Sequence, residues 1–207
     1  INDRLLLQDA FNLNSLSGLV RFVKKVVIGT LVIEGIGALL YMTVFIPDFG
    51  QKGIWISIFT SVSAFCNAGI DIIAENSLCD YALNPMVNTV TCLLIVIGGI
   101  GYIVWWDIIR VIKNIRQNKR KIFGNLTLHS KIAIISTLLL IIVGAILVFV
   151  LEYDNPQTLK DYTLLQKIEV SFFQSVTTRT AGFATLPQEN LTNATAVVCL
   201  FLMFIGG

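Results

Sequence analysis

The sequence is poor in residues that bind metals or perform catalysis. It has one histidine, His129, and its four cysteines (Cys66, Cys79, Cys92 and Cys199) lie far apart without a C-x-x-C pair. A zinc site needs about four such ligands at short, regular spacings, so we predict no metal centre of this kind. We interpret the cysteines as small buried residues plus one loop thiol, and His129 as an interfacial residue. A membrane enzyme would need a nucleophile with its base or paired inward carboxylates, and no such constellation is present. We therefore predict that the protein is not an enzyme and carries no organic cofactor.

Charge is also scarce. Charged residues make up 14% of the 207 residues, against about 25% in soluble domains. Hydrophobic residues make up 55%, and the mean hydropathy is +0.78. This composition predicts an integral membrane protein in contact with lipid, and no nucleic-acid partner. The chain starts at Ile1 and stops at Gly207 inside an apolar run, so we expect an internal fragment of a longer polypeptide.

Long apolar runs alternate with shorter ones. The long runs lie at 26–46, 86–112, 131–151 and from Ala194 onward, and the complete ones can cross a hydrocarbon core of about 30 Å as helices. The shorter segments "GIWISIFTSVSAFC" and "TLLQKIEVSFFQSVTT" reach only about 20 Å as helices. Each precedes irregular small-residue sequence that must turn back. Such backbone is tolerated at membrane depth only where protein buries it or it lines a watery cavity. We therefore predict two re-entrant half-helices with loops.

Charge predicts the orientation of these segments. Cytoplasmic loops are enriched in lysine and arginine. The connection after the second long run is strongly basic, with Asp107 as its only acid. Its basic residues are Arg110, Lys113, Arg116, Lys119, Arg120, Lys121 and Lys131. This connection should be cytoplasmic, and the acidic connections should lie outside. The order helix, half-helix, loop, helix thus occurs twice in the same orientation, around an axis along the membrane normal. The predicted fold class is all-α integral membrane, potassium-channel-like.

The two loops share one outline. They read "FTSVSAFCNAGIDII" at 59–73 and "FFQSVTTRTAGFATL" at 172–186. A half-helix that enters from outside points its partly negative C-terminus toward the membrane centre, which favours a cation. The glycine that follows can adopt positive φ and turn carbonyls toward an axis. Rings of carbonyls can replace the water around potassium, so we predict an ion-binding site here.

These motifs resemble a known family. "SVTTRTAGF" and "SVSAFCNAGI" resemble the third and second pore loops of the Trk/Ktr/HKT superfamily of potassium transporters. "GGIGYIVWWDI" resembles the helix after the second loop of the bacterial KtrB-type membrane subunit. The resemblance implies that four such repeats surround one pore. Residues 1–112 would then be the second repeat with its cytoplasmic approach, 113–130 a basic cytoplasmic linker, and 131–207 a truncated third repeat.

The resemblance also implies a site and partners. The filter backbone would be Asn67, Ala68, Gly69 and Ile70 in one repeat and Thr180, Ala181, Gly182 and Phe183 in the next. Counted from the glycines, the two loops differ by one residue in their distance from the preceding Ser-Val, so the half-helices should end differently. The implied function is potassium uptake across the plasma membrane, as a multi-pass protein of the bacterial inner membrane. Sodium assistance stays open. A homodimer, a glycine-rich gate beyond Gly207 and a cytosolic nucleotide-binding regulatory ring are implied as well. A potassium or non-selective cation channel subunit is the alternative; a membrane enzyme or a structural module fits less well.

Two charged residues fall at membrane depth. Glu34 lies in the middle of a helix, where an unpaired charge costs about 2.5 to 3.5 kcal/mol. It should either contact the cation or bond to a re-entrant loop. Arg179 adjoins the filter, and in the lumen it would repel potassium. We expect it to support the filter from behind, by bracing carbonyls or by pairing with a carboxylate such as Glu169.

Glycines outside the loops have simpler expected roles. Gly98, Gly99 and Gly101 should permit close helix packing, with a hinge as the alternative. Gly144 lies away from the loops, so its substitution should affect the ion site much less than substitution of the loop glycines.

Overall fold

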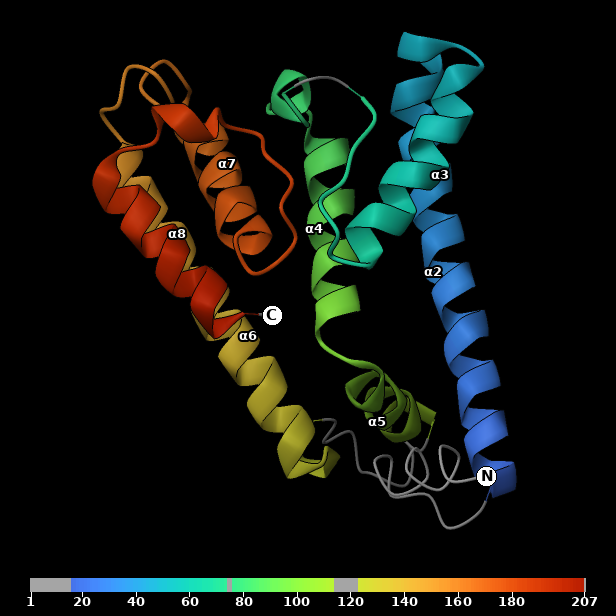
Figure 1. The fold of residues 1–207 in the computed structure, drawn as a ribbon. Coiled ribbons are helices and arrows are strands. Elements are labelled where there is room, and N and C mark those ends of the chain that lie inside the picture. Colours follow the sequence, from blue (N-terminus) through green and yellow to red (C-terminus); the bar gives the residue numbers. More distant parts are fainter. Residues whose placement is uncertain (1–15, 74–75, 114–122, 207) are drawn as a thin grey trace.

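The structure is a computed structural model that describes residues 16–73, 76–113 and 123–206. Its regular elements within these ranges are helices (Figure 1). They are α2 (Leu16–Phe49), α3 (Lys52–Phe65), η1 (Cys79–Tyr81), α4 (Pro85–Gly99), α5 (Tyr102–Lys113), η2 (Phe123–Asn125), α6 (Leu128–Glu152), α7 (Leu164–Thr177), η3 (Gln188–Asn190) and α8 (Asn193–Ile205). The predicted all-helical membrane fold is confirmed.

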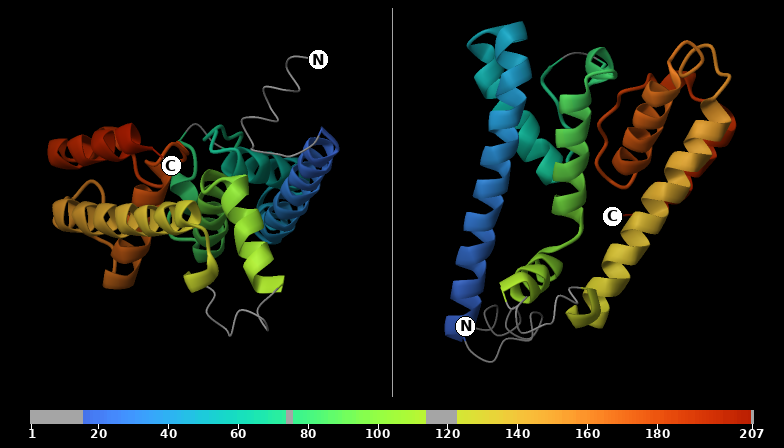
Figure 2. Two further views of the ribbon diagram at one scale, coloured as in Figure 1. Left: turned by 90° about the horizontal axis from the view of Figure 1, so that it is seen from below. Right: turned by 180° about the vertical axis from the view of Figure 1, so that it is seen from behind.

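The helices form two similar units side by side. One consists of α2, α3 and α4, and the other of α6, α7 and α8 (Figure 1 and Figure 2). In each unit a half-helix of 14 residues descends from the same end of the molecule and is followed by a loop that turns back. At about 1.5 Å per residue such a helix reaches about 21 Å, too short to cross a membrane. Each half-helix is therefore too short to be a membrane span and is followed by a returning loop, as the sequence predicted.

Among the described residues, two single helices are long and apolar enough to cross a membrane: residues 22–49 of α2, and all of α6. The run at 86–112 is not one straight helix, which corrects the sequence prediction. It breaks into α4 and α5, which meet at an angle of 97°. Gly101 lies at the break with a φ of +88°, a conformation that glycine adopts without steric cost. Hydropathy alone does not show this bend, because apolar residues continue on both sides.

Gly98 has the packing role that we predicted. A Cβ atom on Gly98 would lie 1.9 Å from the backbone oxygen of Phe65, the last residue of α3. Only a residue without a side chain lets α4 approach the end of the half-helix this closely. Of the two roles considered for these glycines, Gly98 therefore has the packing role and Gly101 lies at the bend.

At two places in the described part of the chain, a buried carboxylate of one helix binds the N-cap of another, α5 with α6 and α6 with α8. Thr127 and Thr192 cap α6 and α8, each accepting a hydrogen bond from the backbone N–H three residues on. The backbone N–H and hydroxyl of Thr127 donate to Asp107 Oδ2 at 2.8 and 2.9 Å. Those of Thr192 donate to Glu152 Oε1, both at 2.9 Å. A carboxylate at a helix N-terminus is favoured by the helix dipole. These joints hold the N-termini of α6 and α8 in the second unit.

The predicted orientation can be tested by cysteine labelling in intact cells. After removal of the native cysteines, Asp161→Cys should react with an impermeant thiol reagent, because the acidic α6–α7 connection is predicted to lie outside. Asn118→Cys should not react, since it lies in the basic connection predicted to be cytoplasmic. Asn118 and four of the seven basic residues lie outside the described residues. Labelling of Asn118→Cys together with protection of Asp161→Cys would show that the orientation is the opposite of the predicted one.

Candidate ion-binding site

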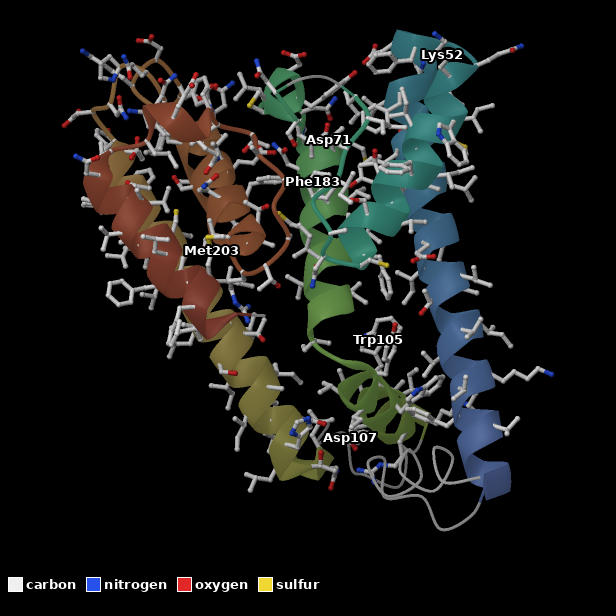
Figure 3. The ribbon with its side chains drawn as sticks, in the orientation of Figure 1. Lys52, Asp71, Trp105, Asp107, Phe183 and Met203 are labelled. Atoms are coloured by element: carbon white, nitrogen blue, oxygen red, sulfur yellow. The ribbon has the colours of Figure 1, made fainter. Side chains whose placement is uncertain are left out.

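The loops that follow α3 and α7 meet at the centre of the molecule. In Figure 3 the labels of Asp71 and Phe183 mark the two facing loops. A Cβ atom on Gly69 would lie 2.1 Å from the backbone oxygen of Ala181, and one on Gly182 would lie 3.4 Å from the Cα of Gly69. The two loops are therefore in direct backbone contact. The structure brings the two predicted filter segments, 67–70 and 180–183, together in one place.

Both loops share an unusual backbone pattern. The first and third residues of each predicted filter segment have positive φ: 51° at Asn67, 65° at Gly69, 83° at Thr180 and 92° at Gly182. The alanine between them does not. Alternation of this kind groups successive N–H groups on one side of the chain, and the filter hypothesis requires the carbonyls to face the other side. Positive φ at a β-branched residue costs about 1–3 kcal/mol and clusters at functional sites. Thr180 thus supports the functional interpretation of this loop.

Hydroxyl groups of the half-helices hold the far end of each loop. Ser63 Oγ donates to the backbone oxygen of Ile70 at 2.5 Å, and Thr177 Oγ1 donates to that of Phe183 at 2.6 Å. The two bonds are equivalent in the two units. The carbonyls of Ile70 and Phe183 are thus engaged by their own half-helices, although each oxygen keeps a second lone pair.

The repeated Ser-Val pair has a structural role that the sequence analysis missed. Ser61 Oγ donates to the backbone oxygen of Glu34 at 2.7 Å, and Ser175 Oγ donates to that of Ile141 at 2.8 Å. Both serines are fully buried. Each ties its half-helix to the long helix before it, α2 or α6. The repetition of Ser-Val at the same place in both motifs was the signal that could have revealed this role.

The half-helices end differently, as predicted. Relative to the Ser-Val pair, α3 continues four residues beyond Ser61, whereas α7 ends two residues beyond Ser175. The longer first loop motif is therefore accommodated by a longer helix. The helix is two residues longer and the motif only one, so the stretch from the helix end to the glycine is one residue shorter in the first unit (65–69) than in the second (177–182).

A second set of bonds joins the units beyond the filter segments. The backbone N–H of Leu78 donates to the oxygen of Ala184 at 2.9 Å, and the N–H of Ala184 donates to Ser77 Oγ at 3.2 Å. Cys79 Sγ also donates to the oxygen of Ala184, at 3.7 Å. Burial raises the pKa of the Cys79 thiol, which therefore keeps the proton that it donates. These bonds fix the two loops relative to each other.

Arg179 is buried, with 7% of its surface exposed. Its Nε donates to the backbone oxygen of Gly206 at 3.2 Å, and its Nη1 to that of Thr137 at 3.4 Å. It therefore braces carbonyls of α6 and of the α8 C-terminus rather than those of the filter segments. The alternative pairing with Glu169 is wrong, because Glu169 faces α4 and accepts a hydrogen bond from Asn88 Nδ2 at 3.0 Å.

Glu34 contacts the end of the first half-helix. It is 9% exposed, and its Oε1 accepts a weak hydrogen bond from the thiol of Cys66, the C-cap of α3, at 3.9 Å. Of the two predicted roles, the structure shows the contact with the re-entrant segment. Asn67 also turns its side chain away from the facing loop. With its amide oriented to match its surroundings, Nδ2 donates to the backbone oxygens of Ala64 and Ile95, both at 3.2 Å. The backbone of Asn67, rather than its side chain, is thus available to an ion.

Gly144 is closely packed, although its distance from the loops suggested that a substitution there would have little effect. A Cβ atom there would lie 2.3 Å from Ser175 Oγ and 2.8 Å from Leu202 Cδ1. A side chain at this position would displace the Ser175 hydroxyl, which donates to the oxygen of Ile141, and the end of the Leu202 side chain. Gly50 is the better control for glycine substitutions. Its φ is +59° and a Cβ atom would meet nothing within 4 Å, so it reproduces the backbone strain without the packing.

The fold and the paired loops define an integral membrane protein of the pore-loop type. The chain matches the TrkH family, described as "Cation transport protein", over residues 7–207. It therefore belongs to the TrkH cation transport protein family.

Curated relatives agree with this assignment. The chain is 40% identical over 205 residues to the potassium/sodium uptake protein NtpJ of Enterococcus hirae, which covers 99% of this chain and 43% of that protein. It is 37% identical over 207 residues to the Ktr system potassium uptake protein B of Bacillus subtilis, covering 100% of this chain and 44% of that protein. A protein of the same name from Vibrio alginolyticus is 35% identical over 187 residues, covering 90% of this chain and 39% of the relative. The chain thus spans less than half the length of these relatives.

Proposed function

We propose that the complete protein takes up potassium through a pore to which these two loops contribute backbone ligands. One observation carries the proposal: two loops, each behind a half-helix, meet with the same alternation of positive φ. Each half-helix directs its partly negative C-terminus toward the loops, which favours a cation. Carbonyl rings of this kind can replace the hydration shell of potassium.

The proposed ion ligands are the backbone carbonyls of the filter segments 67–70 and 180–183. The carbonyls of Ile70 and Phe183 already accept hydrogen bonds from Ser63 and Thr177, so they are the weaker ligands. We therefore assign the main contacts to residues 67–69 and 180–182. Arg179 and Glu34 support the segments indirectly, through α8 and through the end of α3.

The names of the relatives bear on the ion. Two are potassium uptake proteins and one is a potassium/sodium uptake protein. Potassium is therefore the proposed substrate, and sodium is either a second substrate or an assisting ion. A cation channel subunit is the second candidate, because the loop geometry itself does not require coupled transport.

We propose that the rest of the pore comes from parts of the same polypeptide outside this chain. Residues 1–112 would form the second of four repeats, 113–130 a cytoplasmic linker, and 131–207 most of the third. The relatives named as components of a Ktr system favour a multi-component assembly. By family resemblance we propose a homodimer with a cytosolic nucleotide-binding regulatory ring, in the bacterial plasma membrane.

Growth rescue tests the proposal. The complete protein should restore growth of a potassium-uptake-deficient bacterium on low potassium, whereas residues 1–207 alone should fail because half of the proposed ligand ring is missing. Uptake in the presence and absence of sodium then separates sodium-assisted from independent transport. Failure of the complete, membrane-inserted protein to restore growth would contradict potassium uptake.

A further inference from the structure

A groove of about 440 Å³ lies between the two units, away from the filter segments. Its volume is within the range of ligand sites, about 300–1,000 Å³. Apolar side chains from three helices line most of it: Cys92 and Val96 from α4, Leu138 and Ile142 from α6, and Phe172 from α7. Leu138 and Ile142 are 53% and 54% exposed. This groove is open to the side of the molecule and belongs to its membrane-embedded part.

One end of the groove is polar. Asn88 and Glu169 line it there, joined by the hydrogen bond from Asn88 Nδ2 to Glu169 Oε1 at 3.0 Å. Asn88 is 2% exposed, and its Nδ2 also donates to the oxygen of Ala82 at 2.8 Å. Its Oδ1 is buried without a donor. A buried carbonyl oxygen without a donor costs about 1–3 kcal/mol, so this end of the groove is short of a hydrogen-bond donor.

The same end is short of positive charge. Among the described residues, no cationic side chain lies within salt-bridge distance of Glu169. The ion pair found in this part of the chain joins Arg110 and Asp107, which do not line the groove. A carboxylate in the membrane-embedded part of a protein normally pairs with a cation. The polar end therefore lacks a group that is both cationic and a hydrogen-bond donor.

The polar end of the groove lies near the outer ends of α4 and α7, a position that corresponds to the headgroup level of a lipid. Asn88 is three residues inside the start of α4 and Glu169 five residues inside the start of α7, about 5–8 Å along each helix. Asn88, Cys92 and Val96 follow one another at intervals of four residues and so form one stripe on α4. The apolar part of the groove thus extends about 12 Å further into the membrane.

We propose that this groove binds a phospholipid with a primary ammonium headgroup, of the phosphatidylethanolamine class, in the leaflet that faces the outer ends of α4 and α7. The ammonium pairs with Glu169 and, once the buried Asn88 side chain shifts toward the groove, also donates to Asn88 Oδ1, while one acyl chain occupies the stripe below. Glu169 disfavours an anionic headgroup, and a choline headgroup has no N–H to donate. The lipid then bridges the two units that hold the facing loops.

Native mass spectrometry of the purified complete protein tests this site. After delipidation the protein is titrated with phosphatidylethanolamine, phosphatidylcholine and phosphatidylglycerol of the same acyl composition. We expect phosphatidylethanolamine to bind at least about tenfold more tightly than the other two. Glu169→Gln should remove this preference, whereas Glu189→Gln, on exposed η3, should keep it.

A second variant tests the apolar part. Leu138→Trp should fill the groove and weaken binding of all three lipids, while leaving the polar end intact. Equal binding of the three lipids by the wild-type protein would overturn the proposal. So would the absence of binding, as expected if another segment of the polypeptide covers the groove. The measurement does not depend on transport, so its outcome is separate from that of the proposed function.

Discussion

Gly69→Ser in the complete protein is expected to abolish potassium-selective uptake at normal membrane expression. The φ of Gly69 is +65°, which costs a non-glycine residue about 1 kcal/mol or more. The added Cβ would also lie 2.1 Å from the backbone oxygen of Ala181, and backbone cannot move aside as a flexible side chain can. The serine therefore displaces carbonyls of both loops at once, and a partly dehydrated ion loses ligands.

Gly182→Ser should have the same kind of effect, but a smaller one. Its φ of +92° makes any side chain strained. The nearest atom to its added Cβ, however, would be the Cα of Gly69 at 3.4 Å, an ordinary contact distance. We expect weaker potassium affinity and reduced discrimination against sodium, with residual uptake.

Uptake of potassium and sodium at matched expression measures both effects. Gly50→Ser is the control, because it introduces a side chain at a φ of +59° in open space and should leave the ion ratio unchanged. The prediction concerns the ratio of the ions rather than the amount of protein. Wild-type affinity and selectivity in both loop variants would mean that these loops are not the filter.

Arg179→Lys is expected to impair transport by about tenfold or more, although charge is kept. The guanidinium donates from two nitrogens to Gly206 and Thr137, which lie on different helices. A single ammonium cannot reproduce a planar fork. Each hydrogen bond from a charged group contributes about 1.5–3 kcal/mol, and loss of one corresponds to about tenfold or more in an equilibrium. The end of α8 would then no longer be held against the end of α7.

Arg110→Lys is the matched control. Its side chain is 57% exposed and pairs with Asp107, which a lysine can also do. Potassium uptake by both variants, measured with surface expression, should separate them clearly. Normal uptake and selectivity in Arg179→Ala would show that this buried arginine does not support the pathway.

The lengths of the two short apolar segments and the small residues that follow them were enough to predict two re-entrant half-helices. A helix of 14 residues cannot cross a membrane, and the glycine after each half-helix marks where the backbone takes positive φ. The bend at Gly101 was predictable only as the alternative, a hinge at Gly98, Gly99 and Gly101, because apolar residues surround it and hydropathy is continuous there. Whether a helix continues straight past such a glycine depends on the packing of the segment that follows it.

The partners of Arg179 were not predictable for a different reason. They are backbone oxygens, which every residue has, and they lie 42 and 27 residues away in sequence. The surroundings of Gly144 were missed similarly, since a sequence does not show that Ser175 and Leu202 pack against it. Contacts that involve backbone, or that converge from three helices, leave no pattern in a single sequence.

The most direct test of the ion-binding site is to locate the ion. Crystals of the complete protein grown with rubidium or thallium in place of potassium would show the ion by anomalous scattering. The account predicts a peak beside the backbone carbonyls of 67–69 and 180–182, which is lost in Gly69→Ser. Ion peaks elsewhere in the membrane-embedded part, with none between these two loops, would contradict it.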